Sequence, residues 1–120
     1  MSYIKINYDC ALPGMELIDL PSDISGFLDA CYSHLECDSI EHTYTVWPDI
    51  IMILDECGKL DSNWIHKFNN LASVVHGCNS DVIVGNAILA QIDNADVVPL
   101  SEVQIERISK YFNLNRSKSS

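Results

Sequence analysis

The sequence contains few basic residues. Its 120 residues include 7 Lys and Arg against 17 Asp and Glu, which gives a formal net charge of −10. A charge of this sign opposes contact with the phosphates of nucleic acid and with anionic lipid. We therefore expect no direct binding of nucleic acid, whereas a partner protein with a basic surface remains compatible with the charge.

Long hydrophobic runs are also absent. No segment reaches the roughly 18 consecutive apolar residues that a membrane-spanning helix needs. The first residues, MSYIKINYD, lack the basic and then apolar layout of a signal peptide. The sequence therefore predicts a cytoplasmic protein without a membrane partner.

Motifs for metal binding and catalysis are missing as well. The number of cysteines is odd and no CxxC pair occurs, which favours reduced thiols over disulfides or a zinc ribbon. His34 and Cys37 stand three residues apart, but no second pair matches them, so we interpret the spacing as fortuitous. No GxSxG, HExxH, phosphate-loop or dinucleotide-binding pattern is present. We predict no metal, no cofactor and no catalytic residue.

Alternating and helical hydrophobic patterns do occur, and in the first half of the chain they predict three elements. Residues 3–8 alternate as a strand with one buried face, and Pro13-Gly14 turns the chain into a second strand at residues 15–20. Apolar residues then recur at helical spacing from Ile24 to Leu35, with Ser22 as the expected N-cap.

The second half continues with strands and a well-marked last helix. Residues 39–46 predict a half-exposed strand and residues 50–54 a buried central one, followed by a turn in which Gly58 is free to adopt positive φ. Residues 60–75 form either a helix or two short turns. Residues 82–92 predict a strand interrupted at Gly85-Asn86, and a capping box of Ser101 and Gln104 begins a helix that reaches about Phe112.

Together these elements predict the α+β class. We expect a single domain over residues 1–112, in which a mixed, mostly antiparallel sheet is covered on one face by two or three helices. Residues 113–120 have little to bury, and we expect a disordered C-terminal tail.

Amide and imidazole groups cluster in one loop-like region and suggest a ligand site. Such groups can read the edges of a small molecule, or they can satisfy buried backbone groups in an irregular connection. Trp47 and Trp64 can stack on a base or pack in the core. The candidate ligand-binding residues are Asn69, Asn70, His76, Asn79, Gly85, Asn86, Trp47 and Trp64.

Three short blocks of the sequence resemble a known family. Residues 50–60 end an apolar strand in D-E-C-G-K-L, residues 70–73 read N-L-A-S, and residues 81–89 read D-V-I-V-G-N-A-I-L. This order resembles a family of small uncharacterised proteins of bacteriophages, plasmids and other mobile elements, whose shared domain has no known function. The family usually has a proline before its asparagine, where this chain has Asn69. The resemblance covers about residues 39–112 and implies a bacterial host cell.

The resemblance, by analogy with other small acidic proteins of mobile elements, implies a counter-defence role. The leading hypothesis is a homo-oligomeric protein that binds and sequesters a small nucleotide immune signal without catalysis. One alternative is an acidic, DNA-mimicking inhibitor of a restriction or CRISPR effector. The other is a hydrolase of the signal, with His42, His66 or His76 as general base.

Overall fold

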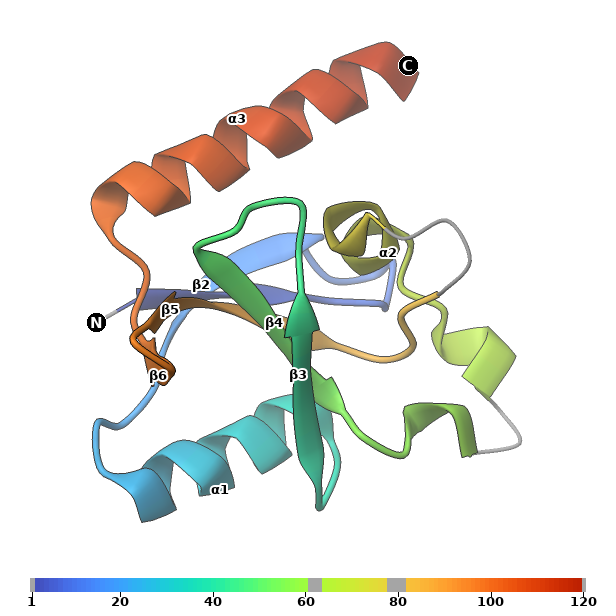
Figure 1. The fold of residues 1–120 in the computed structure, drawn as a ribbon. Helices are drawn as coiled ribbons and strands as arrows, with labels where there is room; N and C mark the ends of the chain where they lie inside the picture. The colour runs from blue at the N-terminus through green and yellow to red at the C-terminus, as the bar shows by residue number, and fades with distance from the viewer. Residues whose placement is uncertain (1, 61–63, 78–81, 120) are drawn as a thin grey trace.

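The computed structural model describes residues 2–60, 64–77 and 82–119, and for Trp64 and residues 113–119 it describes the backbone only. The chain forms one compact α+β domain with a six-stranded sheet and three α-helices (Figure 1). The strand order is β2-β1-β5-β4-β3, β6 pairs with β5, and every strand pair is antiparallel. The strands are β1 (Ser2–Ile6), β2 (Met15–Asp19), β3 (Ile40–Tyr44), β4 (Ile50–Asp55), β5 (Ala87–Asp93) and β6 (Asp96–Val98).

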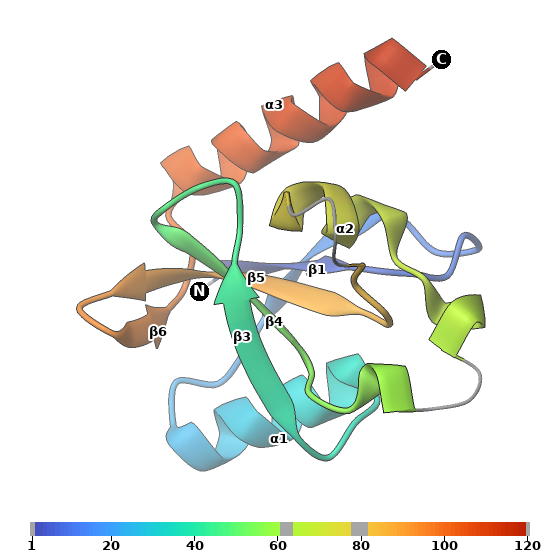
Figure 2. The same cartoon turned by 45° about the vertical axis from the view of Figure 1, so that its right-hand side comes forward.

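The helices cover both faces of the sheet, so the prediction of helices on one face is wrong. In Figures 1 and 2, α1 (Ile24–Leu35) lies below the sheet, and α2 (Asn70–His76) and α3 (Glu102–Ser119) lie above it. Two 3₁₀ turns, η1 (Gly58–Leu60) and η2 (Trp64–Lys67), connect β4 to α2. Helices lie on both faces because the central apolar run of β4 has hydrophobic side chains on each face of the sheet, and both faces have to be buried.

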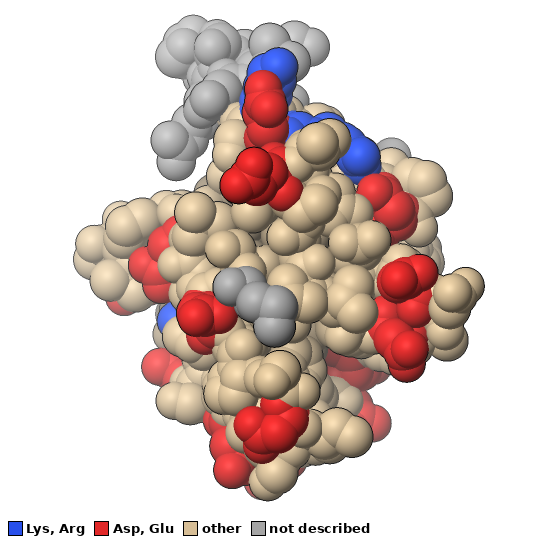
Figure 3. Space-filling model, turned by 90° about the vertical axis from the view of Figure 1, so that its left-hand side faces the viewer, with Lys and Arg blue, Asp and Glu red and all other residues tan. Residues whose placement is uncertain are grey.

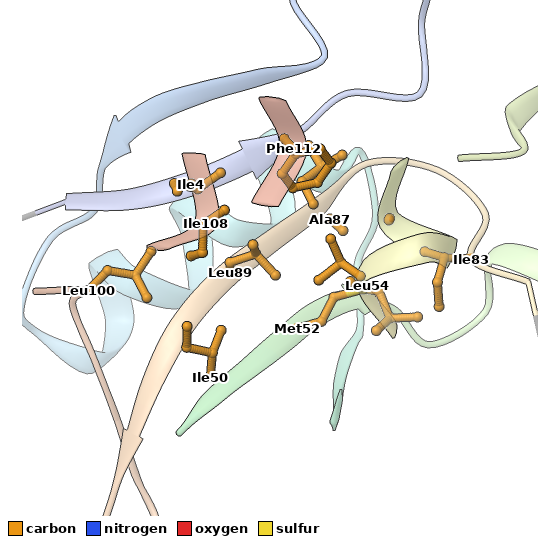
Figure 4. Packing of buried hydrophobic residues seen from close by; sticks show 13 residues of the cluster. Ile4, Ile50, Met52, Leu54, Ile83, Ala87, Leu89, Leu100, Ile108 and Phe112 are labelled. Atoms are coloured by element: carbon orange, nitrogen blue, oxygen red, sulfur yellow. The ribbon is translucent and has the colours of Figure 1, made fainter. Parts of the chain in front are cut away.

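Two hydrophobic clusters show this two-sided burial. Met52 of β4 and Leu89 of β5 belong to the cluster under α2 and α3, part of which is drawn in Figure 4. Their neighbours Ile53 and Ile88 point to the opposite face and pack with Cys31 of α1. Because successive side chains of a strand alternate between faces, β4 and β5 form the centre of both layers.

Two local expectations at turns are corrected by the structure. The N-cap of α1 is Asp23 rather than Ser22, since the Asp23 carboxylate accepts the backbone N–H of Gly26 at 2.8 Å. Among the described glycines, positive φ occurs at Gly77 and Gly85 and not at Gly58. Gly85 takes φ 81°, which stops the expected strand of residues 82–92 from beginning before Ala87.

The uncertain segment of residues 60–75 is resolved into short turns and a short helix. The two 3₁₀ turns come first, and α2 then begins after Asn69, whose side chain caps it. The adjacent pair Asn69-Asn70 therefore marks a helix start instead of an interruption, as expected from the preference of asparagine for N-cap positions.

The predicted start of the last helix is confirmed. The backbone N–H of Ser101 donates to Gln104 Oε1 at 2.8 Å, and the N–H of Gln104 donates to Ser101 Oγ at 3.2 Å. Helix α3 continues through Ser119, beyond the expected end near Phe112. The disorder of residues 113–120 in solution stays a prediction.

The β5–β6 hairpin suggests a stabilising substitution. Asn94 and Ala95 form its two-residue loop with φ of 49° and 72°, the left-handed conformations of a type I′ turn. Since a Cβ disfavours this region, Ala95→Gly is expected to raise the free energy of unfolding by about 0.5–1 kcal/mol. Urea denaturation measures the change. Ala11→Gly, at an exposed alanine without positive φ, is the control and should bring no gain.

None of the helices among the described residues is long and apolar enough to cross a bilayer.

Candidate functional site

Two adjoining hollows lie where β4 ends, and they share Asp55, Gly58 and Val84 as lining residues. The first, named here the Lys59 hollow, has a volume of about 90 Å³, and the second, the Lys67 hollow, about 100 Å³. The remaining lining residues of the Lys59 hollow are Glu41, Leu54, Glu56, Lys59, Val82 and Ile83. Those of the Lys67 hollow are Tyr8, Leu35, Glu36, Lys67, Gly85 and Asn86.

The turn after β4 brings its polar side chains to this place. Asp55 Oδ1 accepts the backbone N–H of Cys57 at 2.9 Å, an arrangement that reverses the chain directly after the strand. A Cβ on Gly58 would lie 3.5 Å from the carbonyl oxygen of Val84, at ordinary contact distance. The 3₁₀ turn η1 therefore packs closely against the segment that precedes β5.

That segment is joined to η2 by backbone pairing. The N–H of Gly85 donates to the carbonyl of Lys67 at 2.6 Å, and the N–H of Asn69 donates to the carbonyl of Ile83 at 2.8 Å. An isolated bridge between Phe68 and Val84 lies between these bonds. The N–H of Ile83 also donates to Ser73 Oγ at 2.9 Å, so the described residues of the three blocks on which the sequence resemblance rests are neighbours in space.

Asn69 ties the elements together and is 1 % exposed. Its Oδ1 accepts the backbone N–H of Ala72 at 3.0 Å, as an N-cap. Its Nδ2 donates to the carbonyls of Ile6 at 3.1 Å and Gly85 at 2.8 Å. The Asn69 side chain therefore satisfies buried backbone groups, which is one of the two roles that the sequence suggested for this cluster.

The side chain of Asn86 also joins two elements by hydrogen bonds, namely the segment after β1 and helix α1. Its Oδ1 accepts the N–H of Tyr8 at 3.1 Å, and its Nδ2 donates to the carbonyl of His34 at 3.0 Å. The residue is 7 % exposed and lines the Lys67 hollow. Asn86 thereby forms a fixed wall of the hollow.

The other predicted ligand-binding residues either lie apart from the two hollows or fall outside the part of the chain that the structure describes. Asn70 is exposed at the first position of α2, and His76 is buried, with Nδ1 2.9 Å from the carbonyl oxygen of Tyr44. Trp47 packs edge-on against Tyr111 of α3, with ring centroids 5.0 Å apart. The side chain of Trp64 and all of Asn79 lie outside the described part of the chain.

The charges around the hollows are of both signs. Two of the seven Lys and Arg of the chain, Lys59 and Lys67, line the hollows together with four carboxylates, those of Glu36, Glu41, Asp55 and Glu56. Sequence reasoning did not single out Lys67 or Tyr8, because no pattern in their neighbourhood marks them. Lys59 stood within the D-E-C-G-K-L block, which was the one signal that pointed to it.

His34 and Cys37 both lie in partly buried surroundings that shift their pKa values. Burial lowers the pKa of His34, assisted by Lys5 and opposed by Glu16. Burial also raises the pKa of Cys37, and nearby Asp55 adds to this shift. Among the described residues, no group of three His, Cys, Asp or Glu side chains is placed to hold a metal ion.

Comparison with models of protein families shows to which family the chain belongs. The model of the family called Domain of unknown function (DUF3846) matches residues 13–113. The chain belongs to this family. Within the DUF3846 domain lie β2 to β6, all three α-helices up to residue 113, and both hollows except for Tyr8. No curated protein and no solved structure matches the chain.

Proposed function

We propose that this DUF3846 protein binds a small nucleotide signal in the Lys59 and Lys67 hollows and holds it without turnover. The observation that carries the proposal is the joint placement of lysines and carboxylates on two adjoining hollows. Ammonium groups bind phosphate oxygens, and carboxylates accept hydrogen bonds from ribose hydroxyls. A nucleotide supplies both kinds of partner, so the mixed charge suits it better than it suits a simple anion.

The size of the hollows limits what enters them. Each is smaller than the roughly 300 Å³ at which pockets for whole drug-sized molecules begin. We infer that a phosphate and a sugar occupy the hollows while the base remains at their rim. Tyr8, half-buried at the edge of the Lys67 hollow, is the aromatic residue that we assign to the base.

Sequestration without catalysis is supported by the positions of the histidines. His42 of β3 and His66 of η2 are exposed, His76 is buried, and none of the three lines either hollow. A general base has to reach the proton that it removes. The counter-defence role in a bacterial host is the part of the proposal that rests on the family resemblance. Cytoplasmic location and homo-oligomeric assembly are further parts of the proposal, which do not depend on that resemblance.

An acidic inhibitor of a nucleic-acid-binding protein is the competing proposal. On the face seen in Figure 3, the Asp and Glu side chains stand in separate groups with uncharged surface between them. A DNA mimic uses a continuous negative surface, and the described residues of the face seen in Figure 3 do not offer one. The two also differ in salt dependence, because an exposed charged interface weakens steeply with ionic strength.

Native mass spectrometry tests the proposed function. The purified protein is incubated with cyclic dinucleotides, cyclic oligonucleotides and ADP-ribose-derived signals, and bound molecules are released by heat and weighed. An intact nucleotide supports sequestration, a cleaved one indicates a hydrolase, and binding of none of the panel contradicts the small-nucleotide proposal. The same spectra report the oligomeric state.

A charge reversal locates the site. Lys67→Glu is expected to weaken nucleotide binding about tenfold or more, because a charge-assisted hydrogen bond becomes a repulsion. Lys110→Glu makes the same charge change on the exposed surface of α3, where Lys110 pairs with Glu106, and should leave binding nearly unchanged. Equal weakening by both variants would show an effect of net charge rather than of the Lys67 hollow.

A further inference from the structure

A larger hollow lies at the opposite end of α1 from the two hollows described above. It has a volume of about 510 Å³, within the range of roughly 300–1,000 Å³ typical of small-molecule pockets. It is bounded by the start of α1, by β6 and by the residue that follows β6. Its apolar walls include Pro21, Ile24, Phe27, Leu28, Val97 and Pro99.

Tyr3 forms the floor of this hollow, named here the α1–β6 hollow. The residue is 4 % exposed and yet lines the opening. Within the described part of the chain, no hydrogen bond to the Tyr3 hydroxyl is present, and the one fully enclosed side-chain oxygen without a partner is Asn7 Oδ1. Tyr3 thus contributes a hydroxyl-bearing side chain to the lining of the hollow.

Aromatic surface accompanies this hydroxyl. The rings of Tyr3 and Phe27 lie 5.9 Å apart at 54°, and both residues line the hollow. Because Tyr3 is buried and Phe27 is only partly buried, the Phe27 ring is the aromatic surface on which a flat molecule packs. A tyrosine hydroxyl is protonated at neutral pH, and burial raises the pKa of Tyr3 further, with contributions from Cys31 and Asp19.

The charge around the hollow selects the kind of ligand. Asp96 lines it, and none of the Lys and Arg side chains that the structure describes does. At the start of α1, where an anion is otherwise favoured, the Asp23 carboxylate already accepts the N–H of Gly26. In Figure 3, which views the side of the molecule with β6 and the start of α1, Lys and Arg appear mainly along α3. An anionic ligand is thus disfavoured here.

We propose that the α1–β6 hollow is a second binding site, which takes a flat aromatic or heteroaromatic compound with an uncharged or cationic polar group. The ring packs between Phe27 and Val97, and the polar group meets the Tyr3 hydroxyl or the Asp96 carboxylate. The site is separate from the Lys59 and Lys67 hollows, since the 12 residues of α1 span roughly 18 Å between them.

Three compounds of the same ring and size but different charge test the proposal. Benzamidine, benzamide and benzoate are titrated into the full-length protein, and amide chemical shifts are followed by NMR. Benzamidine and benzamide are expected to bind with millimolar affinity and to shift the signals of Tyr3, Phe27 and Val97. Benzoate is expected to bind about tenfold more weakly than benzamidine, because it faces Asp96.

Two variants test whether these compounds bind in the α1–β6 hollow. Val97→Trp fills the hollow and should abolish the shifts, whereas Leu60→Trp, at an exposed position of η1, should not. Tyr3→Phe keeps the ring and should weaken benzamide binding roughly threefold to tenfold. If benzoate binds as well as benzamidine, if folded Val97→Trp and Tyr3→Phe both bind like the parent, or if none of the three compounds shifts these signals, the proposal is wrong.

Discussion

Replacement of Asn69 by alanine is expected to lower the free energy of unfolding by about 3 kcal/mol, a large part of the stability of a domain of this size. The substitution removes the N-cap of α2, which costs about 1 kcal/mol. It also removes the donor to the carbonyls of Ile6 and Gly85, which lie in a mostly buried region. A buried polar group left without a partner costs about 1–3 kcal/mol. Chemical denaturation followed by circular dichroism measures the loss.

The neighbouring residue supplies the control for this prediction. Asn70 has the same side chain and adjoins Asn69, but it is exposed at the first position of α2. Asn70→Ala is expected to change the free energy of unfolding by less than about 0.5 kcal/mol. Should Asn69→Ala prove as mild as Asn70→Ala, the three hydrogen bonds would not hold the domain as described.

The role of Asn69 also bears on the candidate site. Through its bond to the Gly85 carbonyl it fixes the segment that forms one wall of the Lys67 hollow. Loss of ligand binding in Asn69→Ala would therefore reflect a displaced wall, and the proposed contacts have to be tested at Lys67 instead. The distinction matters because an asparagine in a polar loop looks the same in the sequence whether it binds a ligand or the backbone.

The parts of the fold that depend on local patterns were predictable from the sequence. The alternation of residues 3–8, the apolar run of residues 50–54 and the Ser101–Gln104 capping box each determine a nearby element, and the structure contains all three. The two-sided cover of the sheet was not predicted. The run in β4 contains apolar residues on both faces, which already indicates two covers, but helix periodicity alone does not say which face each helix takes.

The candidate site was predictable only in part. Gly85 and Asn86 were among the predicted ligand-binding residues and line the Lys67 hollow, whereas the D-E-C-G-K-L block, which also lines the hollows, was noted only for its family resemblance. Lys67 escaped recognition because its place depends on the pairing of its carbonyl with the Gly85 N–H, a contact between segments with no regular structure. Trp47 was assigned to the ligand on its chemistry alone, whereas the structure packs it against α3. Long-range pairing of irregular segments leaves no periodic signal in a sequence.

Replacement of Phe112 by alanine is the second substitution with a large expected effect, about 3–5 kcal/mol of lost stability. Phe112 is 2 % exposed and belongs to the cluster between α3 and the sheet, where Figure 4 draws it beside Ile4 and Ala87. Truncation removes the buried ring and leaves a cavity that the strands cannot close. The loss appears as a lower midpoint in urea, with the slope of the transition unchanged.

Lys110 provides the comparison on the same helix. Its side chain is 72 % exposed and pairs with Glu106 at 3.2 Å, an i,i+4 contact on the solvent side of α3. Lys110→Ala is expected to cost less than about 0.5 kcal/mol. A similar small cost for Phe112→Ala would mean that α3 is not a cover of the upper face. Of the two helices on that face only α2 would then cover the sheet, and the apolar side chains of β4 and β5 under α3 would need another partner, such as a second copy of the chain.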